Sequence, residues 1–297
     1  MTKLSPLASV AETRAVLEAH GLTTKYSLGQ NFLINDAILQ KIVALSQVSE
    51  SDDVLEVGPG IGTLTIALLK HAGRVASVER DADLPAVLAE TLAPWADRFT
   101  LISKDALDLC TEDLPFSPTK LVANLPYAVA ATVVLDYFEG FASLESATVM
   151  VQKEVADRMA AQPGTKTYGA YTVKLRLYAE PAGRFAVGPG NFFPPPRVES
   201  AVLRLDRRPV FDEAGDPLDA AALKAAAVMA DASFATRRKT IANSCKTYFG
   251  GRGAEGARVI ERLPELLDHA GIDPKRRGET LDLPEFIKLG AALQQIV

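Results

Sequence analysis

Residues 54–63 read Val-Leu-Glu-Val-Gly-Pro-Gly-Ile-Gly-Thr, an apolar run followed by three glycines at alternate positions. The apolar run is typical of a buried strand, and a helical pattern begins directly after it. Glycines at such a junction let the backbone turn sharply and approach a ligand closely, as in dinucleotide-binding folds. The spacing here is GxGxG and differs from the GxGxxG of dinucleotide-binding loops, in which a glycine would stand at the position of Thr63. A tight turn that binds nothing is the alternative interpretation.

The alternation of strand and helix extends on both sides of this loop. Strand-like apolar runs occur at residues 54–57, 74–78, 99–103, 120–123 and 147–152, and helical patterns occur at residues 36–46, 63–70, 84–92, 129–138 and 154–161. This order is typical of an α/β fold with a doubly wound parallel sheet. Two further β-rich runs, residues 172–177 and 200–205, are separated by a loop at 188–197 with four prolines, and they predict an edge hairpin.

The composition changes near residue 206. A turn-rich stretch at 212–217 is followed only by helical patterns, at residues 218–233, 237–249, 257–267 and 283–296. We therefore expect two domains, an α/β domain over residues 1–205 and a smaller all-α domain over residues 206–297.

Composition excludes several classes of protein. The 297 residues are 48% hydrophobic and 23% charged, as in soluble globular proteins. Cys110 and Cys245 lack CxxC spacing, and the three histidines are scattered, so neither a disulfide framework nor a metal site is expected. No apolar run is long enough for a membrane span or placed as a secretory signal. We expect a cytoplasmic protein.

Charge is distributed unevenly along the chain. The net charge of −5 alone favours an enzyme acting on small molecules over a protein that coats nucleic acid. Residues 1–205 carry 18 basic and 23 acidic side chains, whereas residues 206–297 carry 14 of each. The stretch 235–258 holds six basic side chains against one acidic one, a local charge of +5. The acidity therefore belongs to the first domain, and a folded RNA could meet a basic patch on the second.

Acidic residues follow the second and third strands of the predicted sheet. Glu79 ends the run at 74–79, where it could hold two ribose hydroxyls, and Asp105 follows the next strand within reach of an adenine ring. A glycine loop with these two acids resembles the S-adenosylmethionine site of Rossmann-like methyltransferases more than an NAD site.

The sequence Asn124-Leu125-Pro126-Tyr127 follows the fourth strand. An exocyclic adenine amine is a poor nucleophile, because its lone pair is delocalised into the ring. The side-chain carbonyl of Asn124 and the backbone carbonyl of Leu125 could each accept one N–H and aim the lone pair at a sulfonium methyl. Pro126 would fix the turn and Tyr127 would stack on a flipped base. A simple turn is the alternative.

Taken in order, these motifs resemble the ribosomal RNA adenine N6-dimethyltransferases of the KsgA type, which act on small-subunit RNA. The resemblance covers nearly the whole chain and includes residues 27–33, 192–202 and 237–244 besides the motifs above. It implies a Rossmann-like class I methyltransferase sheet of seven strands, the last antiparallel, with residues 1–205 as the catalytic domain. It also implies a helical RNA- and ribosome-binding domain at 206–297. Ala128 and Cys245 depart from the common family residues, which affects packing details only.

The resemblance implies S-adenosyl-L-methionine as cofactor, S-adenosyl-L-homocysteine as product, and no metal. The residues expected to bind the cofactor are Asn31 and Leu33 at the methionine end, Gly58 and Gly60 through the backbone, Glu79 at the ribose, Asp105 at the adenine, and Asn124. For the target base it implies Asn124, Leu125, Pro126 and Tyr127, with Phe192 in an F-x-P-x-P-x-V loop sandwiching the adenine opposite Tyr127. A rigid surface loop is the alternative at 192–196.

RNA contacts are expected from the basic stretch of the second domain, namely Arg237, Arg238, Lys239 and Lys246. A second basic triplet lies at 275–277, and a solvated helix face is the alternative for each of these side chains. The expected partner is the small ribosomal subunit with its 16S RNA, and a monomer is expected for an enzyme that docks on so large a particle.

Four functions are compatible with these motifs to different degrees. The leading one is dimethylation of N6 on two adjacent adenines of small-subunit RNA, late in subunit biogenesis. A large-subunit methyltransferase of the macrolide-resistance type shares the first domain's motifs, but residues 237–244 argue against it. A ribosome-assembly factor whose binding matters more than its methylation is a further alternative. An NAD-dependent dehydrogenase is disfavoured by Thr63 and by the lack of a suitably placed catalytic His or Tyr-Lys pair.

Overall fold

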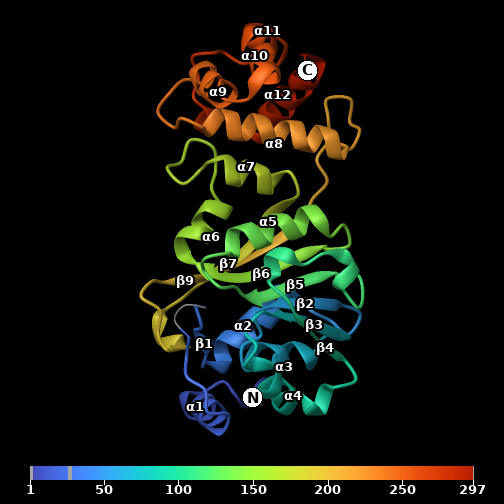
Figure 1. The fold of residues 1–297 in the computed structure, drawn as a ribbon, viewed down its shortest axis with the longest axis vertical. Helices are drawn as coiled ribbons and strands as arrows, with labels where there is room; N and C mark the ends of the chain where they lie inside the picture. The colour runs from blue at the N-terminus through green and yellow to red at the C-terminus, as the bar shows by residue number, and fades with distance from the viewer. Residues whose placement is uncertain (1–2, 26–28, 297) are drawn as a thin grey trace. The chain divides into compact units, whose positions relative to one another are not determined.

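The computed structural model describes residues 3–25 and 29–296, and it divides the chain into two compact units (Figure 1). The first unit comprises Met1–Ala156 and Pro181–Arg207, and the second comprises Asp157–Glu180 and Arg208–Val297. The return to the second unit after Arg207 lies close to the boundary expected at 205, but the assignment of Asp157–Glu180 to the first domain was wrong. Tyr168 and Val173 belong to the apolar core of the second unit, and the Tyr168 hydroxyl donates to the Leu281 carbonyl at 2.9 Å.

A seven-stranded sheet forms the first unit, in the order β4-β3-β2-β5-β6-β9-β7 (Figure 1). Its strands are β2 (Asp53–Val57), β3 (Arg74–Glu79), β4 (Phe99–Ser103), β5 (Lys120–Asn124), β6 (Ser146–Gln152), β7 (Ala179–Val187) and β9 (Ser200–Arg207). Strands β2 to β6 pair in parallel, while β9 pairs antiparallel with β6. The expected α/β fold with an antiparallel last strand is thereby confirmed.

The helices of the first unit are α1 (Val10–Ala19), α2 (Asp36–Ser46), α3 (Thr63–Leu69), α4 (Leu84–Thr91), α5 (Ala130–Gly140) and α6 (Lys153–Met159), the last crossing into the second unit. Five of them, α2 to α6, lie where the apolar patterns predict them, whereas the N-terminal helix α1 was not predicted. Central strands are apolar on both faces, since parallel sheets are covered by helices on both sides. Val54 and Leu55 of β2, for example, are both fully buried.

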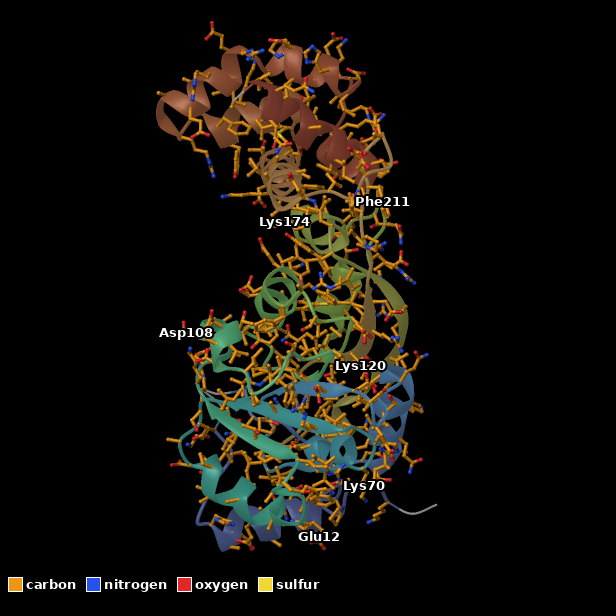
Figure 2. The ribbon with its side chains drawn as sticks, turned by 90° about the vertical axis from the view of Figure 1, so that its right-hand side faces the viewer. Glu12, Lys70, Asp108, Lys120, Lys174 and Phe211 are labelled. Atoms are coloured by element: carbon orange, nitrogen blue, oxygen red, sulfur yellow. The ribbon has the colours of Figure 1, made fainter. Side chains whose placement is uncertain are left out.

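An ion pair lies against this apolar interior, at the start of β5. Lys120, at the start of β5 (Figure 2), places Nζ 2.9 Å from Oδ2 of Asp52, and both side chains are nearly buried. The Lys120 ammonium also donates to the Gln47 carbonyl, so its charge is both paired and hydrogen-bonded. Burial of a charge is tolerated under those two conditions.

The predicted edge hairpin of residues 172–177 and 200–205 was wrong in two respects. Residues 172–176 fall on helix α7 (Ala170–Arg176), with Leu177 as its C-cap, and β9 lies inside the sheet between β6 and β7. Thr172, Val173 and Leu175 are all buried. A strand would point Thr172 and Val173 to opposite faces, whereas one side of a helix buries both.

A two-stranded ribbon joins distant parts of the first unit. Strand β1 (Phe32–Leu33) pairs antiparallel with β8 (Phe192–Phe193), so that Leu33 lies opposite Phe192. The ribbon connects the N-terminal segment to the proline-rich loop, two stretches that the sequence motifs assign to the same site.

The second unit is helical, as expected for the smaller C-terminal part. Besides α7 it contains α8 (Ala220–Phe234), α9 (Ile241–Phe249), α10 (Gly253–Glu261), α11 (Leu263–His269) and α12 (Leu283–Ile296). Helix α9 begins after Thr240, whose hydroxyl caps it, rather than at residue 237. The run expected at 257–267 is divided between α10 and α11, because Pro264 favours the first turn of a new helix.

Within the described ranges, every helix is too short or too polar to cross a membrane.

Candidate active site

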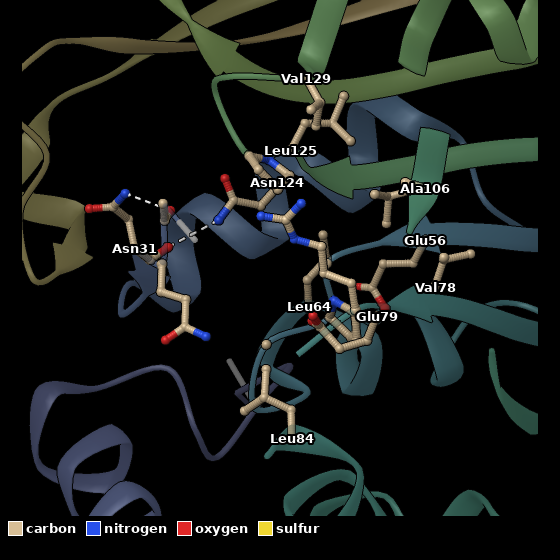
Figure 3. Close-up of a pocket in the computed structure, with 18 of the residues that line it drawn as sticks. Asn31, Glu56, Leu64, Val78, Glu79, Leu84, Ala106, Asn124, Leu125 and Val129 are labelled. Atoms are coloured by element: carbon tan, nitrogen blue, oxygen red, sulfur yellow. Dashed lines mark hydrogen bonds between the residues drawn. The ribbon is translucent and has the colours of Figure 1, made fainter. Parts of the chain in front are cut away.

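A cavity of about 330 Å³ lies at the carboxyl ends of β2, β3 and β5, in the first unit (Figure 3). This is where parallel α/β sheets bind their ligands. The predicted site residues that line it are Asn31, Leu33, Gly58, Gly60, Glu79, Asp105, Asn124, Leu125, Pro126 and Tyr127. Ser27 and Leu28, which begin the family motif at residues 27–33, lie outside the described residues.

The glycine loop approaches the cavity with backbone conformations that favour glycine. Gly58, Gly60 and Gly62 have φ values of +70°, +59° and +92°. A side chain on Gly58 would face the Pro126 ring at 3.7 Å, and one on Gly60 would meet the Phe32 ring at 3.0 Å. The loop therefore leaves its backbone, rather than side chains, against the cavity and the Asn124–Tyr127 segment.

Two carboxylates, those of Glu79 and Asp105, line the same cavity as the glycine loop. Glu79 accepts a hydrogen bond from the Asp81 backbone N–H at 2.8 Å, and burial raises its pKa above the ordinary value. Asp105 accepts from the Leu107 N–H at 3.0 Å and pairs with Arg80 at 3.0 Å. The backbone bond from Leu107 and the Arg80 partner lower the pKa of Asp105. Both acids line the same cavity, as their positions at the end of β3 and after β4 predicted.

Glu56, beneath the glycine loop, is a residue that the sequence analysis did not single out. Its side chain is buried, and Oε2 accepts hydrogen bonds from Thr65 and Ser77, each at 2.7 Å. Burial, reinforced by the charge of Glu79, raises the pKa of Glu56 to about 7. Position 56 lies within the quoted strand, but nothing in an apolar run indicates how an acidic side chain is satisfied.

Asn124 is oriented by the N-terminal segment. Its Nδ2 donates to the Asn31 backbone carbonyl at 3.1 Å (Figure 3). A carbonyl accepts only from the NH₂ end of an amide, so this contact fixes which way the amide faces. Oδ1 of Asn124 is consequently the atom available to accept a hydrogen bond from a ligand.

Tyr127 lies half-buried at the cavity wall, and its hydroxyl is 2.7 Å from Oγ of Ser200. Burial raises the pKa of Tyr127 above its ordinary value. Ser200 lies within the family motif at residues 192–202, and its position 73 residues from Tyr127 gave no sign of this contact.

Phe192 differs from the sequence-based expectation. Its ring is only 2% exposed, packs in the core of the first unit, and is not part of the cavity wall. Its backbone is placed near the site by the pairing with Leu33. Stacking on a base requires this ring to leave the position it occupies here.

The N-terminal segment is held to the acidic loop after β3. Lys25 Nζ lies 2.6 Å from Oδ1 of Asp81, and Gln30 Nε2 donates to Oδ2 at 2.7 Å. Asp81 in turn binds Glu79 through its N–H. These contacts connect the segment that carries Asn31 to the loop that carries Glu79, which the separate motifs did not reveal.

The basic stretch of the second unit is only partly available. Arg238, Lys239 and Lys246 are exposed, and among the described residues they form no ion pair. Arg237 donates to the Lys166 carbonyl and lies 4.0 Å from Glu279. In the triplet at 275–277, Arg276 pairs with Glu285.

Comparison with known proteins identifies the family. The family model described as ribosomal RNA adenine dimethylase matches residues 21–288. The chain belongs to the ribosomal RNA adenine dimethylase family. The match confirms the resemblance drawn from the motifs. The chain is therefore an S-adenosylmethionine-dependent methyltransferase.

Full-length relatives of this dimethylase share its length as well as its motifs. "Ribosomal RNA small subunit methyltransferase A" of Rhodococcus opacus is 43% identical over 289 residues, covering 96% of this chain and 94% of the relative. The protein of the same name from Enterococcus faecalis is 39% identical over 301 residues, covering 99% of each chain.

Solved structures show the same fold. A dimethyladenosine transferase from Plasmodium falciparum superposes with a TM-score of 0.72 at 23% identity, covering 87% of this chain and 95% of that one. The 23S rRNA methyltransferase ErmE superposes with a TM-score of 0.64 at 27% identity, covering 89% and 100%.

Proposed function

We propose that this dimethylase transfers two methyl groups from S-adenosyl-L-methionine to N6 of each of two adjacent adenines in small-subunit 16S ribosomal RNA. The observation that carries the proposal is the fixed amide of Asn124, which presents Oδ1 beside a cavity lined by the glycine loop and Glu79. The small subunit is favoured over the large one because the relatives at about 40% identity over nearly the whole chain are named for the small subunit.

The cavity fits the proposed cofactor. Its volume of about 330 Å³ suits a ligand of that size, and its walls combine close backbone, carboxylates and apolar surface. Glu79 would hold the ribose hydroxyls, Asp105 the adenine amine, and the Gly58–Gly60 backbone the chain between them. Asn31 and Leu33 would contact the methionine end. When bound, S-adenosylmethionine supplies an electrophilic methyl group on a sulfonium.

The residues after β5 act on the target amine. Oδ1 of Asn124 and the carbonyl of Leu125 each accept one N–H of the adenine N6. The nitrogen thereby moves towards sp3 geometry, and its lone pair is less delocalised into the ring and points at the methyl group. Pro126 fixes the turn, and the Tyr127 ring stacks on the base, a contact worth about 1–3 kcal/mol. Phe192 completes the sandwich once its ring turns out of the core. Positioning supplies most of the rate, and the proton departs to water after the methyl has arrived.

The two units have separate proposed roles. The first unit binds the cofactor and carries out the reaction, and the second contributes basic side chains that contact ribosomal RNA. Because its proposed substrate is ribosomal RNA, the enzyme acts in the cytoplasm. It acts as a monomer on a nearly complete small subunit, and it uses no metal.

The test is methylation of small subunits isolated from cells that lack the enzyme, with labelled cofactor. Label should appear as N6,N6-dimethyladenine in 16S RNA. Asn124→Ala should lower the rate by about 100-fold or more, because it removes a preorganised acceptor. Gln40→Ala, a matched loss of an amide on α2, should leave the rate unchanged.

Other outcomes separate the alternatives. Label in large-subunit RNA alone would favour the macrolide-resistance activity. Full rescue of subunit maturation by Asn124→Ala in cells would favour an assembly factor, because only binding would then matter.

A further inference from the structure

The hydroxyl is the only polar group of the Tyr127 side chain, whose ring is proposed to stack on the target base. Its partner, Ser200 Oγ, lies 2.7 Å away. Ser200 is fully buried at the first position of β9, directly after the proline-rich loop. The contact therefore connects the two segments that the motifs assign to the target base, residues 124–127 and 192–200.

Both ends of this contact are anchored on the same strand. Ser200 pairs with Gln152 at the end of the β6–β9 ladder. On the other side, Asn124 pairs with Met150, and the Leu125 N–H donates to the Met150 carbonyl at 3.0 Å. The phenol is thus held by a hydroxyl whose backbone has a fixed position relative to the Asn124 amide.

A tyrosine without this contact would keep its stacking surface but lose its fixed ring angle. The ring must lie parallel to the adenine while N6 reaches both Asn124 and Leu125. Near-attack geometry is sensitive to small displacements, and a shift of about 1 Å can cost about 100-fold in rate. Burial raises the pKa of Tyr127, so the phenol stays neutral and able to hydrogen-bond at ordinary pH.

We propose that Ser200 is a positioning residue, whose hydroxyl fixes the Tyr127 ring at the angle needed to stack on the target adenine. The proposal rests on the proposed function, since it assigns Ser200 to the same base-binding site. The contact should matter most for the second methyl transfer. At that step the amine already carries a methyl group, retains a single N–H, and has less freedom to find a productive position.

The test removes the hydrogen bond from either end. Ser200→Ala and Tyr127→Phe should each lower kcat by about 5- to 20-fold, the range expected for loss of a hydrogen bond and of alignment. The double variant should be no slower than the slower single variant, because both changes break one contact. N6-monomethyladenine should accumulate at partial conversion, with cofactor affinity unchanged. Ser200→Thr, which keeps a hydroxyl, should restore the ratio of dimethyl to monomethyl product.

The controls separate positioning from folding. Ser146→Ala removes a buried serine at the other end of the β6–β9 ladder and should not change the product ratio. Tyr127→Phe creates no cavity, so its kinetics decide the matter if Ser200→Ala lowers the Tm. Multiplying losses in the double variant, or an unchanged rate and product ratio in Tyr127→Phe, would overturn the proposal. Failure of the wild-type enzyme to methylate small subunits would instead contradict the proposed function.

Discussion

At the scale of single residues, the site combines side chains that sequence position predicts with contacts that it cannot. Glu79, Asp105 and Asn124 were predicted because each lies at or just after the carboxyl end of a strand of one parallel sheet, and such ends meet at one edge. The Ser200–Tyr127 contact and the burial of Phe192 depend on side-chain packing between segments far apart in sequence. Periodicity carries no information on such contacts.

Glu56 makes stability depend on pH. Its pKa is raised from 4.5 to about 7, so the folded protein keeps a proton that the unfolded chain releases at lower pH. Its contribution to stability is therefore fully present below about pH 4.5 and is lost as pH rises to about 7. Glu56→Gln stays neutral and its amide oxygen can accept the same two hydroxyl bonds. Between about pH 5 and pH 8, the free energy of unfolding of the wild type should fall by roughly 2–3 kcal/mol relative to that of this variant.

Urea unfolding of both proteins at the two pH values measures this difference. Glu50→Gln, at an exposed carboxylate, is the matched control and should follow wild type. A stability gap between wild type and Glu56→Gln that does not change with pH would contradict the assignment.

At the scale of elements, the predicted strands agree closely with β2 to β6, because buried parallel strands are short, continuous apolar runs. Helix α7 was mistaken for a strand because its β-branched Thr172 and Val173 favour strands locally. Its burial in the second unit decides the matter, and the sequence contains no signal of that long-range packing.

Close packing of α8 on α12 predicts the effect of one added methyl group. A Cβ on Gly290 would lie 2.6 Å from the Ala226 backbone nitrogen and 2.8 Å from its Cα. Gly290→Ala must therefore force the two helices apart, at a cost of about 1–3 kcal/mol that exceeds the gain in helix propensity. Gly251→Ala meets nothing within 4 Å and is the control. Thermal unfolding compares them, and an equal Tm for both variants would show that α12 can shift freely.

At the scale of the whole molecule, the net charge of −5 is unevenly distributed along the chain. Acidity is concentrated in residues 1–205, which form most of the proposed cofactor-binding unit, while residues 206–297 are neutral with a basic stretch. The composition therefore argues against a bulk nucleic-acid binder, and it suits an enzyme that contacts one folded RNA through a local patch.

We predict how the binding constant for small subunits depends on salt from three exposed basic side chains, Arg238, Lys239 and Lys246. Each phosphate contact contributes about 0.7–0.9 to the slope of log K against log salt concentration. Replacing all three with Gln should lower that slope by about 2–3 and leave kcat at saturating substrate unchanged. Equilibrium binding of labelled small subunits over a range of salt concentrations measures the slope. Lys70→Gln, an exposed lysine of the first unit, is the control. An unchanged slope in the triple variant would mean that these side chains are a solvated surface and that RNA is contacted elsewhere.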